Sequence, residues 1–104
     1  MPEFKTLNWS LAKPNEHGWD VCEATLSETT KLVLTQTRNT FFIADILDTT
    51  DNSVKFRHRI EITRDAALDM TDFLRTIPEI LYNAIETEIQ TRQNLQNLLA
   101  KLTD

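Results

Sequence analysis

Three basic residues at alternate positions are the clearest chemical feature of this sequence. Lys55, Arg57 and Arg59 alternate with Phe56, His58 and Ile60. A period of two is typical of a half-buried strand, so the three cations are expected on one face at a spacing of about 6.6–7 Å. Such a row can follow the phosphates of an extended single strand of nucleic acid. The residue types and their spacing therefore favour phosphate contacts.

An aromatic pair, Phe41-Phe42, precedes this row in the sequence. An exposed aromatic ring beside cations can stack on a base while the cations hold phosphates. Strand register does not follow from sequence, so either ring can be the one that faces outward. With Phe41 outward, the candidate nucleic-acid-binding residues are Lys31, Arg38, Phe41, Lys55, Arg57 and Arg59. The alternative is a solvated strand edge whose charges oppose aggregation, or a protein interface.

The other residues with chemical potential do not form a catalytic or metal-binding pattern. Gly18 is the only glycine, which excludes a glycine-rich phosphate loop. Cys22 and His17 lack a third, orienting group, and no spacing of Cys, Asp or Glu makes a metal site with His17 or His58. We expect a protein that is not an enzyme and has no cofactor, with Cys22 and His58 as core residues.

Two tryptophans, Trp9 and Trp19, are either core residues or stacking platforms. Core positions are the more usual use of tryptophan in a chain of this size.

Charge and composition limit the choice of partner. The chain has 104 residues, a net charge of −5 and a pI near 4.9, which argues against a general polyanion binder. Residues 31–64 nevertheless hold six bases against four acids, a net charge of +2. A local positive field on the strands of an acidic protein is therefore expected. The single cysteine, the lack of an apolar leader and the lack of a membrane-length apolar run predict a cytoplasmic protein.

Alternating and apolar runs predict an antiparallel sheet of five strands in a single domain, residues 1–104. Residues 1–30 are expected to form a hairpin, with strands at 4–12 and 19–26 separated by a turn around Gly18. Residues 31–64 are expected to hold the three central strands, at 31–37, 40–49 and 54–63, joined by turn-rich segments.

A helical period follows the last strand. Apolar residues recur at three- and four-residue steps from Ala67 to Ile89, and predict a helix packed on one face of the sheet. Thr63 is a plausible N-cap and Asp65 complements the helix dipole. Pro78 interrupts the hydrogen bonding at a cost of about 3 kcal/mol. Because the apolar stripe keeps its phase through Pro78, one kinked helix over 65–102 is expected in preference to two helices.

A helix over 65–102 would be about 57 Å long at ~1.5 Å per residue, longer than five strands are wide at ~4.8 Å each. Its end must overhang the sheet, fold back on it or meet another subunit. We expect a homodimer, with a frayed tail as the alternative. The predicted dimer residues are Leu81, Ile85, Ile89, Leu95 and Leu99.

The order of three strands and a helix resembles the single-stranded-nucleic-acid-binding transcriptional regulators, a group that includes the Pur-repeat proteins, the Whirly proteins and the positive-cofactor type coactivator. The resemblance covers about residues 31–90. It depends on the segment Arg59-Ile60-Glu61-Ile62-Thr63 followed by Asp65, Leu68, Phe73 and Leu74. It implies a homodimer that pairs through its helices and binds single-stranded DNA or RNA across its sheet. This chain is more acidic than the pattern and lacks its glycine-rich basic loop.

The alternative hypothesis is a protein-interaction module, an inhibitor or adaptor that engages an unknown protein partner. It would act through the acidic helix and the C-terminal tail at Leu95–Leu102.

Overall fold

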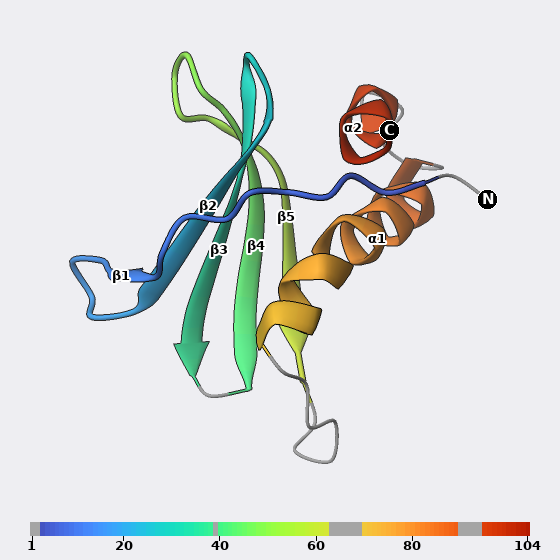
Figure 1. The fold of residues 1–104 in the computed structure, drawn as a ribbon. Coiled ribbons are helices and arrows are strands. Elements are labelled where there is room, and N and C mark those ends of the chain that lie inside the picture. The colour runs from blue at the N-terminus through green and yellow to red at the C-terminus, as the bar shows by residue number, and fades with distance from the viewer. Residues whose placement is uncertain (1–2, 39, 63–69, 90–94) are drawn as a thin grey trace.

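The computed structural model describes residues 3–38, 40–62, 70–89 and 95–104. Five antiparallel strands lie in the sheet in their sequence order, and two helices follow them (Figure 1). The expected α+β class with a five-stranded antiparallel sheet is confirmed. The elements are β1 (Lys13–Pro14), β2 (Asp20–Ser27), β3 (Thr30–Arg38), β4 (Phe41–Asp48), β5 (Val54–Glu61), α1 (Met70–Ile89) and α2 (Gln96–Leu102).

The three central strands lie close to their predicted positions, because turn-forming residues separate them. The β4–β5 turn closes with a hydrogen bond from the amide of Asp48 to the carbonyl of Ser53 at 2.9 Å. Asn52 has a φ of 59° there, a left-handed conformation that asparagine tolerates better than most residues. Turn chemistry of this kind is local, which is why the sequence predicted it.

The first strand differs from the prediction. The alternating segment 4–12 was expected to pair along its length, but among residues 3–19 the regular strand is confined to Lys13–Pro14. Ser10 makes one further backbone contact with the β2 edge, donating its amide to the carbonyl of Glu23 at 2.8 Å. Leu7 and Trp9 pack against the core. Burial of these side chains therefore outweighs continuation of the ladder.

The start of the described chain is tied to its end instead. The amide of Lys5 donates to the carbonyl of Leu102 at 3.0 Å, and Phe4 forms a bridge with Thr103. The ammonium of Lys5 donates to the carbonyl of Leu26 at 2.9 Å. The N-terminal segment thus links β2 to α2 along one side of the molecule (Figure 1).

The prediction of one long kinked helix is wrong beyond Ile89. Helix α1 does run through Pro78, which is buried against the core, so the continuity expected at that residue is confirmed. The chain then forms a separate helix, α2, at Gln96–Leu102. The predicted cap Thr63, Asp65 and the linking residues 90–94 lie outside the described residues.

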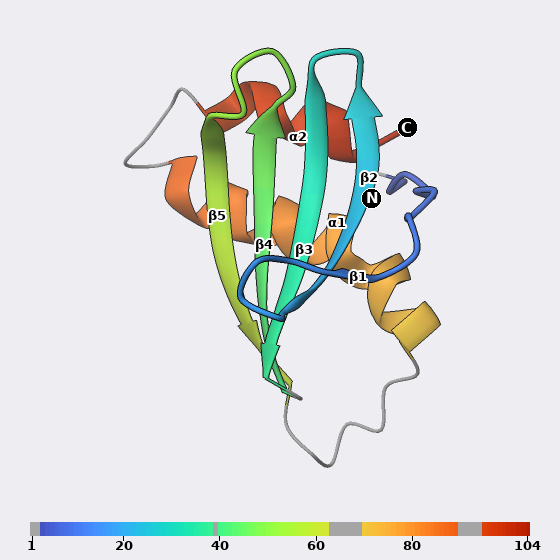
Figure 2. The same cartoon turned by 90° about the vertical axis from the view of Figure 1, so that its left-hand side faces the viewer.

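Helix α2 packs on the same side of the sheet as α1, which is one of the three arrangements that the sequence left open (Figure 2). Its apolar residues and Leu95 before it fill the core of the same chain. Of the predicted dimer residues, Leu81, Ile85 and Leu95 are buried inside the monomer, while Ile89 and Leu99 are half-buried at the margin of the core. Fold-back buries these side chains without a second subunit. The homodimer stays a prediction.

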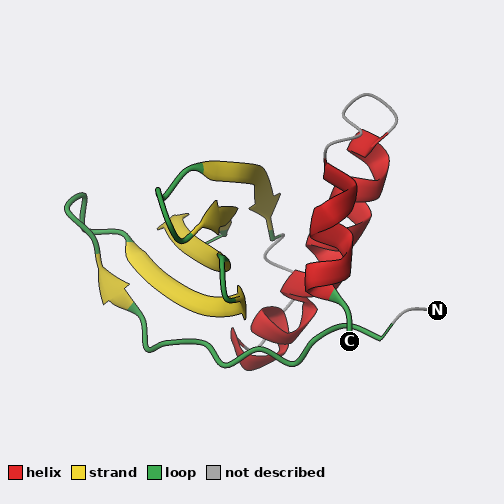
Figure 3. Cartoon of the chain, turned by 90° about the horizontal axis from the view of Figure 1, so that it is seen from above, coloured by secondary structure: helices red, strands yellow, loops and turns green. Residues whose placement is uncertain are grey.

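The core lies between the sheet and the two helices. Strand residues at alternate positions enter it, among them Leu34 of β3, Phe42 and Ile46 of β4 and Phe56 of β5. The rings of Phe42 and Phe73 of α1 are 4.6 Å apart, a close aromatic contact between the layers. Seen from above, the strongly bent sheet has both helices on one side (Figure 3). The helices leave the other face of the sheet uncovered.

Candidate functional site

The face of the sheet that the helices do not cover is the candidate site, and we name it the open face. Alternation with the core residues determines which side chains lie on it. Figure 2 views the sheet from this side, with both helices behind the strands. The open-face residues include Val21, Glu23, Thr25, Lys31, Val33, Thr35, Arg38, Phe41, Ile43, Asp45, Leu47, Arg57, Arg59 and Glu61.

Phe41 is the ring that faces away from the core. Phe42 is 3% exposed and contacts Phe73, so its neighbour Phe41 projects to the other side and is half-buried. Strand pairing places Ile43, two residues on, opposite Arg59 of β5. The open face therefore brings an aromatic ring and an arginine close together. A stacking site needs this arrangement, but the sequence alone did not decide which of the two phenylalanines faces outward.

Arg59 and Arg57 both lie on the open face, but their charges are not equally available. Arg59 is exposed and has no ionic partner among the described residues. Arg57 donates two hydrogen bonds to Asp45 across β4 and β5, from Nε at 2.7 Å and from a terminal nitrogen at 3.2 Å. These hydrogen bonds, with the negative charge of Asp45, raise the pKa of Arg57. Arg57 and Asp45 therefore form an ion pair without net charge.

The remaining predicted cations are spread around this centre. Lys31 pairs with Glu23 of β2 at 3.0 Å, which neutralises it in the same way. Arg38 is exposed at the β3–β4 hairpin, where it pairs with Phe41 across a shift in register. Lys55 lies next to a register shift in β5. It lines a pocket with α2 residues, so it is set apart from the row that the alternation predicted.

Acidic partners were the part of the site that sequence reasoning missed. Asp45 shares the period of Phe41 and Ile43, but only the strand register shows that it lies opposite Arg57. Val33 of β3 lies between two acidic residues, with Glu23 opposite it on β2 and Asp45 opposite it on β4. The open face is consequently close to neutral at its centre. The cations without an ionic partner in the described chain, Arg38 and Arg59, lie at the Phe41 end, where the carboxylate of Glu61 is opposite Phe41.

An arm formed by residues 13–19 stands on the same side as the open face, away from the helices (Figures 1 and 2). It holds Trp19, which is exposed, and the turn at Gly18. Trp9, by contrast, packs against the core. Trp9 thus has the core role that the sequence left open, whereas the indole of Trp19 is exposed.

Residues with metal-binding potential do not gather in the described parts of the chain. Across residues 3–38, 40–62, 70–89 and 95–104, no three His, Cys, Asp or Glu side chains come together to hold a metal ion. Burial, and secondarily the charge of Asp20, raises the pKa of Cys22, which disfavours a reactive thiolate. His58 is half-buried on the core side, with its ring nearly parallel to that of Phe56 at 6.4 Å.

Comparison of the chain with protein-family models, curated proteins and solved structures finds no match. Among the described residues, no helix is long and apolar enough to cross a membrane. The open face presents an aromatic ring, two arginines that have no ionic partner in the described chain, and an apolar centre flanked by ion pairs.

Proposed function

We propose that this protein binds single-stranded nucleic acid on the open face of its sheet. The observation that carries the proposal is the joint placement of Phe41 and Arg59 on the face opposite the helices. An aromatic ring offers stacking to any base, and an unpaired arginine next to it supplies a phosphate contact. Arg38, at the neighbouring hairpin, adds a second cation at the same end.

Charge distribution supports an approach from this side. The outer surface of α1 carries Asp72, Glu79 and Glu86, seven residues apart and all exposed. A spacing of seven returns to nearly the same helix face, so these carboxylates form one acidic strip. A polyanion is repelled from the helical layer and meets its unpaired cations on the open face.

Binding is tested with a labelled single-stranded oligonucleotide, followed by fluorescence anisotropy at about 50 mM and about 200 mM salt. We expect binding that weakens with salt, and weaker binding by Arg59→Ala. Loss of one phosphate contact lowers the magnitude of the salt slope by about 0.7.

Arg75→Ala is the matched control, since Arg75 is an equally charged, exposed residue on α1 and lies on the helical side of the sheet. Its affinity and salt slope should equal those of the unmodified chain. Absence of binding at low salt, or equal losses in the two arginine variants, contradicts the proposal.

A second candidate is a protein-interaction module that uses the acidic strip of α1 to engage a basic partner. The regular spacing of Asp72, Glu79 and Glu86 favours it. The apolar residues of the C-terminal segment are engaged in the core, which leaves the strip as the available surface. Stoichiometric capture of a partner that Glu79→Lys abolishes, together with no oligonucleotide binding, would favour this candidate over the first.

A further inference from the structure

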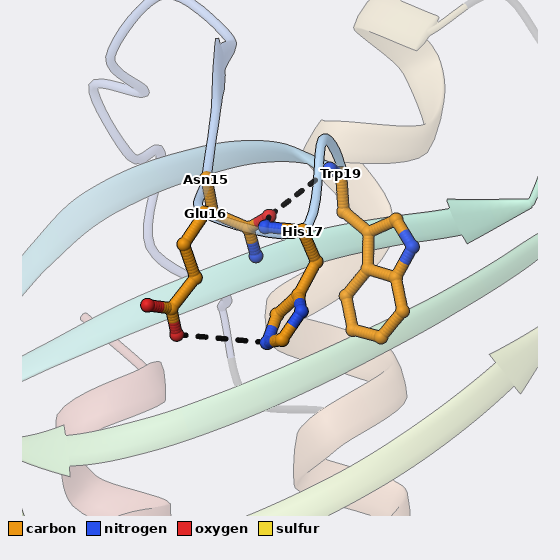
Figure 4. Close-up of polar contacts among 4 residues, drawn as sticks. All are labelled: Asn15, Glu16, His17 and Trp19. Carbon is orange, nitrogen blue, oxygen red and sulfur yellow. Dashed lines mark hydrogen bonds and ion pairs between the residues drawn. The ribbon is translucent and has the colours of Figure 1, made fainter.

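Trp19, like Phe41, is an aromatic residue outside the core. Its exposed fraction is 39%, although full burial of an indole is strongly favourable. Trp19 shares the period of Val21 and Glu23, which lie on the open face. Figure 4 shows its ring in front of the strands, with the helices behind them. The indole is thus held on the side of the molecule where Phe41 and Arg59 lie.

The arm holds Trp19 in place by hydrogen bonds within a short loop. The side-chain oxygen of Asn15 accepts from the amide of His17 at 2.9 Å and from the amide of Trp19 at 3.0 Å (Figure 4). The amide of Asn15 donates to the carbonyl of Trp19 at 2.8 Å, and Gly18 donates to Asn15 at 3.0 Å. Gly18 has a φ of +79°, which glycine adopts without strain. An exposed ring on an ordered loop loses little conformational entropy when it binds.

His17 extends the aromatic surface. Its ring centre is 5.0 Å from that of Trp19, with the two planes tilted by 37°. The Nε2 atom of His17 lies 3.5 Å from Oε1 of Glu16 (Figure 4). The imidazole thus lies between the carboxylate of Glu16 and the indole of Trp19.

We propose that Trp19, supported by His17, is a second base-stacking residue for single-stranded nucleic acid, in addition to Phe41; this rests on the proposed function. Strands β2 and β4 both neighbour β3, so residues on them are about 10 Å apart at ~4.8 Å per strand. That separation exceeds the ~3.4 Å of stacked bases, so the two rings hold two different bases of an extended strand.

The cross-strand register of the sheet also suggests a path for the nucleic acid. Val21, Thr35, Ile43 and Arg59 are successive partners across β2, β3, β4 and β5. Trp19 lies two residues before the first of them, and Phe41 two residues before the third. The β5 partner of Phe41 is Glu61, and Arg59 lies two residues before it on the same strand. A nucleic acid that crosses the strands beside this row therefore meets the indole first and then the phenyl ring, and reaches Arg59 diagonally across from Phe41, beside the carboxylate of Glu61.

The test uses oligothymidylate of about 16 nucleotides, long enough for one small single-strand-binding domain. Trp9→Phe leaves Trp19 as the one indole in the sequence. In this background we expect the tryptophan fluorescence to be quenched on titration, with the same midpoint as anisotropy of a labelled oligonucleotide. Trp19→Ala should raise the Kd at least about fivefold, because one stacked base is lost. Its salt slope should not change, because no phosphate contact is removed.

Leu11→Ala is the matched control, since Leu11 is 85% exposed, precedes the arm and has no ring. It should bind as the unmodified chain does. Asn15→Ala keeps the indole but removes the two hydrogen bonds that the Asn15 side chain accepts from the amides of His17 and Trp19, and should give a smaller loss than Trp19→Ala. If Arg59→Ala weakens binding while Trp19→Ala does not and no quenching occurs, the stacking role is overturned and the proposed function stands. If the unmodified chain does not bind the oligonucleotide, both are overturned.

Discussion

Arg57 and Asp45 form a two-point hydrogen-bonded ion pair between adjacent strands, on the face of the sheet that the helices leave open. Asp45 is 9% exposed, whereas the side chain of Arg57 is about half exposed. The carboxylate therefore depends on the guanidinium for most of its polar contacts. The same pair removes one positive charge from the candidate nucleic-acid site. The pair is therefore expected to raise the stability of the fold and to lower the affinity for nucleic acid.

Replacement of the carboxylate should strengthen binding. Asp45→Asn leaves a hydrogen-bond acceptor for Arg57 but frees its charge, so we expect a lower Kd for single-stranded oligonucleotide and a salt slope larger by up to about 0.7. Anisotropy titrations at two salt concentrations measure both quantities. Glu79→Gln makes the same change in net charge on α1 and is the control. Equal gains in both variants would indicate a net-charge effect instead of a local one.

Replacement of the guanidinium should destabilise the fold. Arg57→Ala leaves the buried Asp45 carboxylate without its two donors, at a cost of about 1–2 kcal/mol in the free energy of unfolding. Arg59→Ala removes a cation that has no ionic partner in the described chain, and should change this free energy by less than about 0.5 kcal/mol. Urea unfolding followed by circular dichroism compares the two. Equal values would show that the ion pair contributes no net stability.

The adjacent phenylalanines should respond very differently to truncation. Phe42→Ala opens a cavity against Phe73 and should cost about 3–5 kcal/mol. Phe41→Ala should cost about 1 kcal/mol or less, because its ring is on the open face. The Kd for oligonucleotide should rise in Phe41→Ala. Urea unfolding and anisotropy give the two readings, and a reversed order of stabilities would contradict the assignment of faces.

Helix α2 should stabilise the chain to which it belongs. Leu102 is 0% exposed, so Leu102→Ala should cost about 2–5 kcal/mol, and each kcal/mol lowers the Tm of a domain of this size by about 4–8 °C. Because α2 packs on its own sheet, the Tm should not depend on protein concentration. Thermal unfolding over a wide concentration range measures both. A Tm that rises with concentration would favour the predicted homodimer.

Two aspartates in the β4–β5 turn should make the protein less stable in acid. Hydrogen bonds from the hydroxyl and amide of Thr50 lower the pKa of Asp48, and a hydrogen bond from the amide of Ser53 lowers that of Asp51. Because the pKa values are lower in the folded state, both carboxylates stabilise the turn above the ordinary aspartate pKa of about 4. This contribution disappears as the pH falls through the lowered values.

The double variant Asp48→Asn/Asp51→Asn tests this directly. It should unfold at a lower temperature than the unmodified chain at about pH 7, and the difference should shrink at about pH 2, where both carboxylates are protonated. Thermal unfolding at the two values of pH gives the comparison. A difference that does not depend on pH would exclude a role for the carboxylate charges.

Local sequence patterns predicted most elements of the fold. Strands β3, β4 and β5 follow from alternating or apolar runs with turn residues between them, and the apolar stripe that continues through Pro78 follows from a helical period. The prediction of the first strand failed because Leu7 and Trp9 have the alternation of a strand but pack, partly buried, against the core beside β2. Alternation records which side chains are apolar, and does not record whether a neighbouring strand is available for pairing.

The sequence by itself determined the α+β class, the strands β2 to β5 and the residue types available to a binding face, because these depend on periodicity and turn chemistry within short segments. Tertiary structure alone decided that Phe41 faces outward, that Asp45 neutralises Arg57, and that α2 folds back on the sheet. Each of these depends on register or docking between distant segments. A shift of one residue in register exchanges the two faces of a strand, and no local pattern reports it.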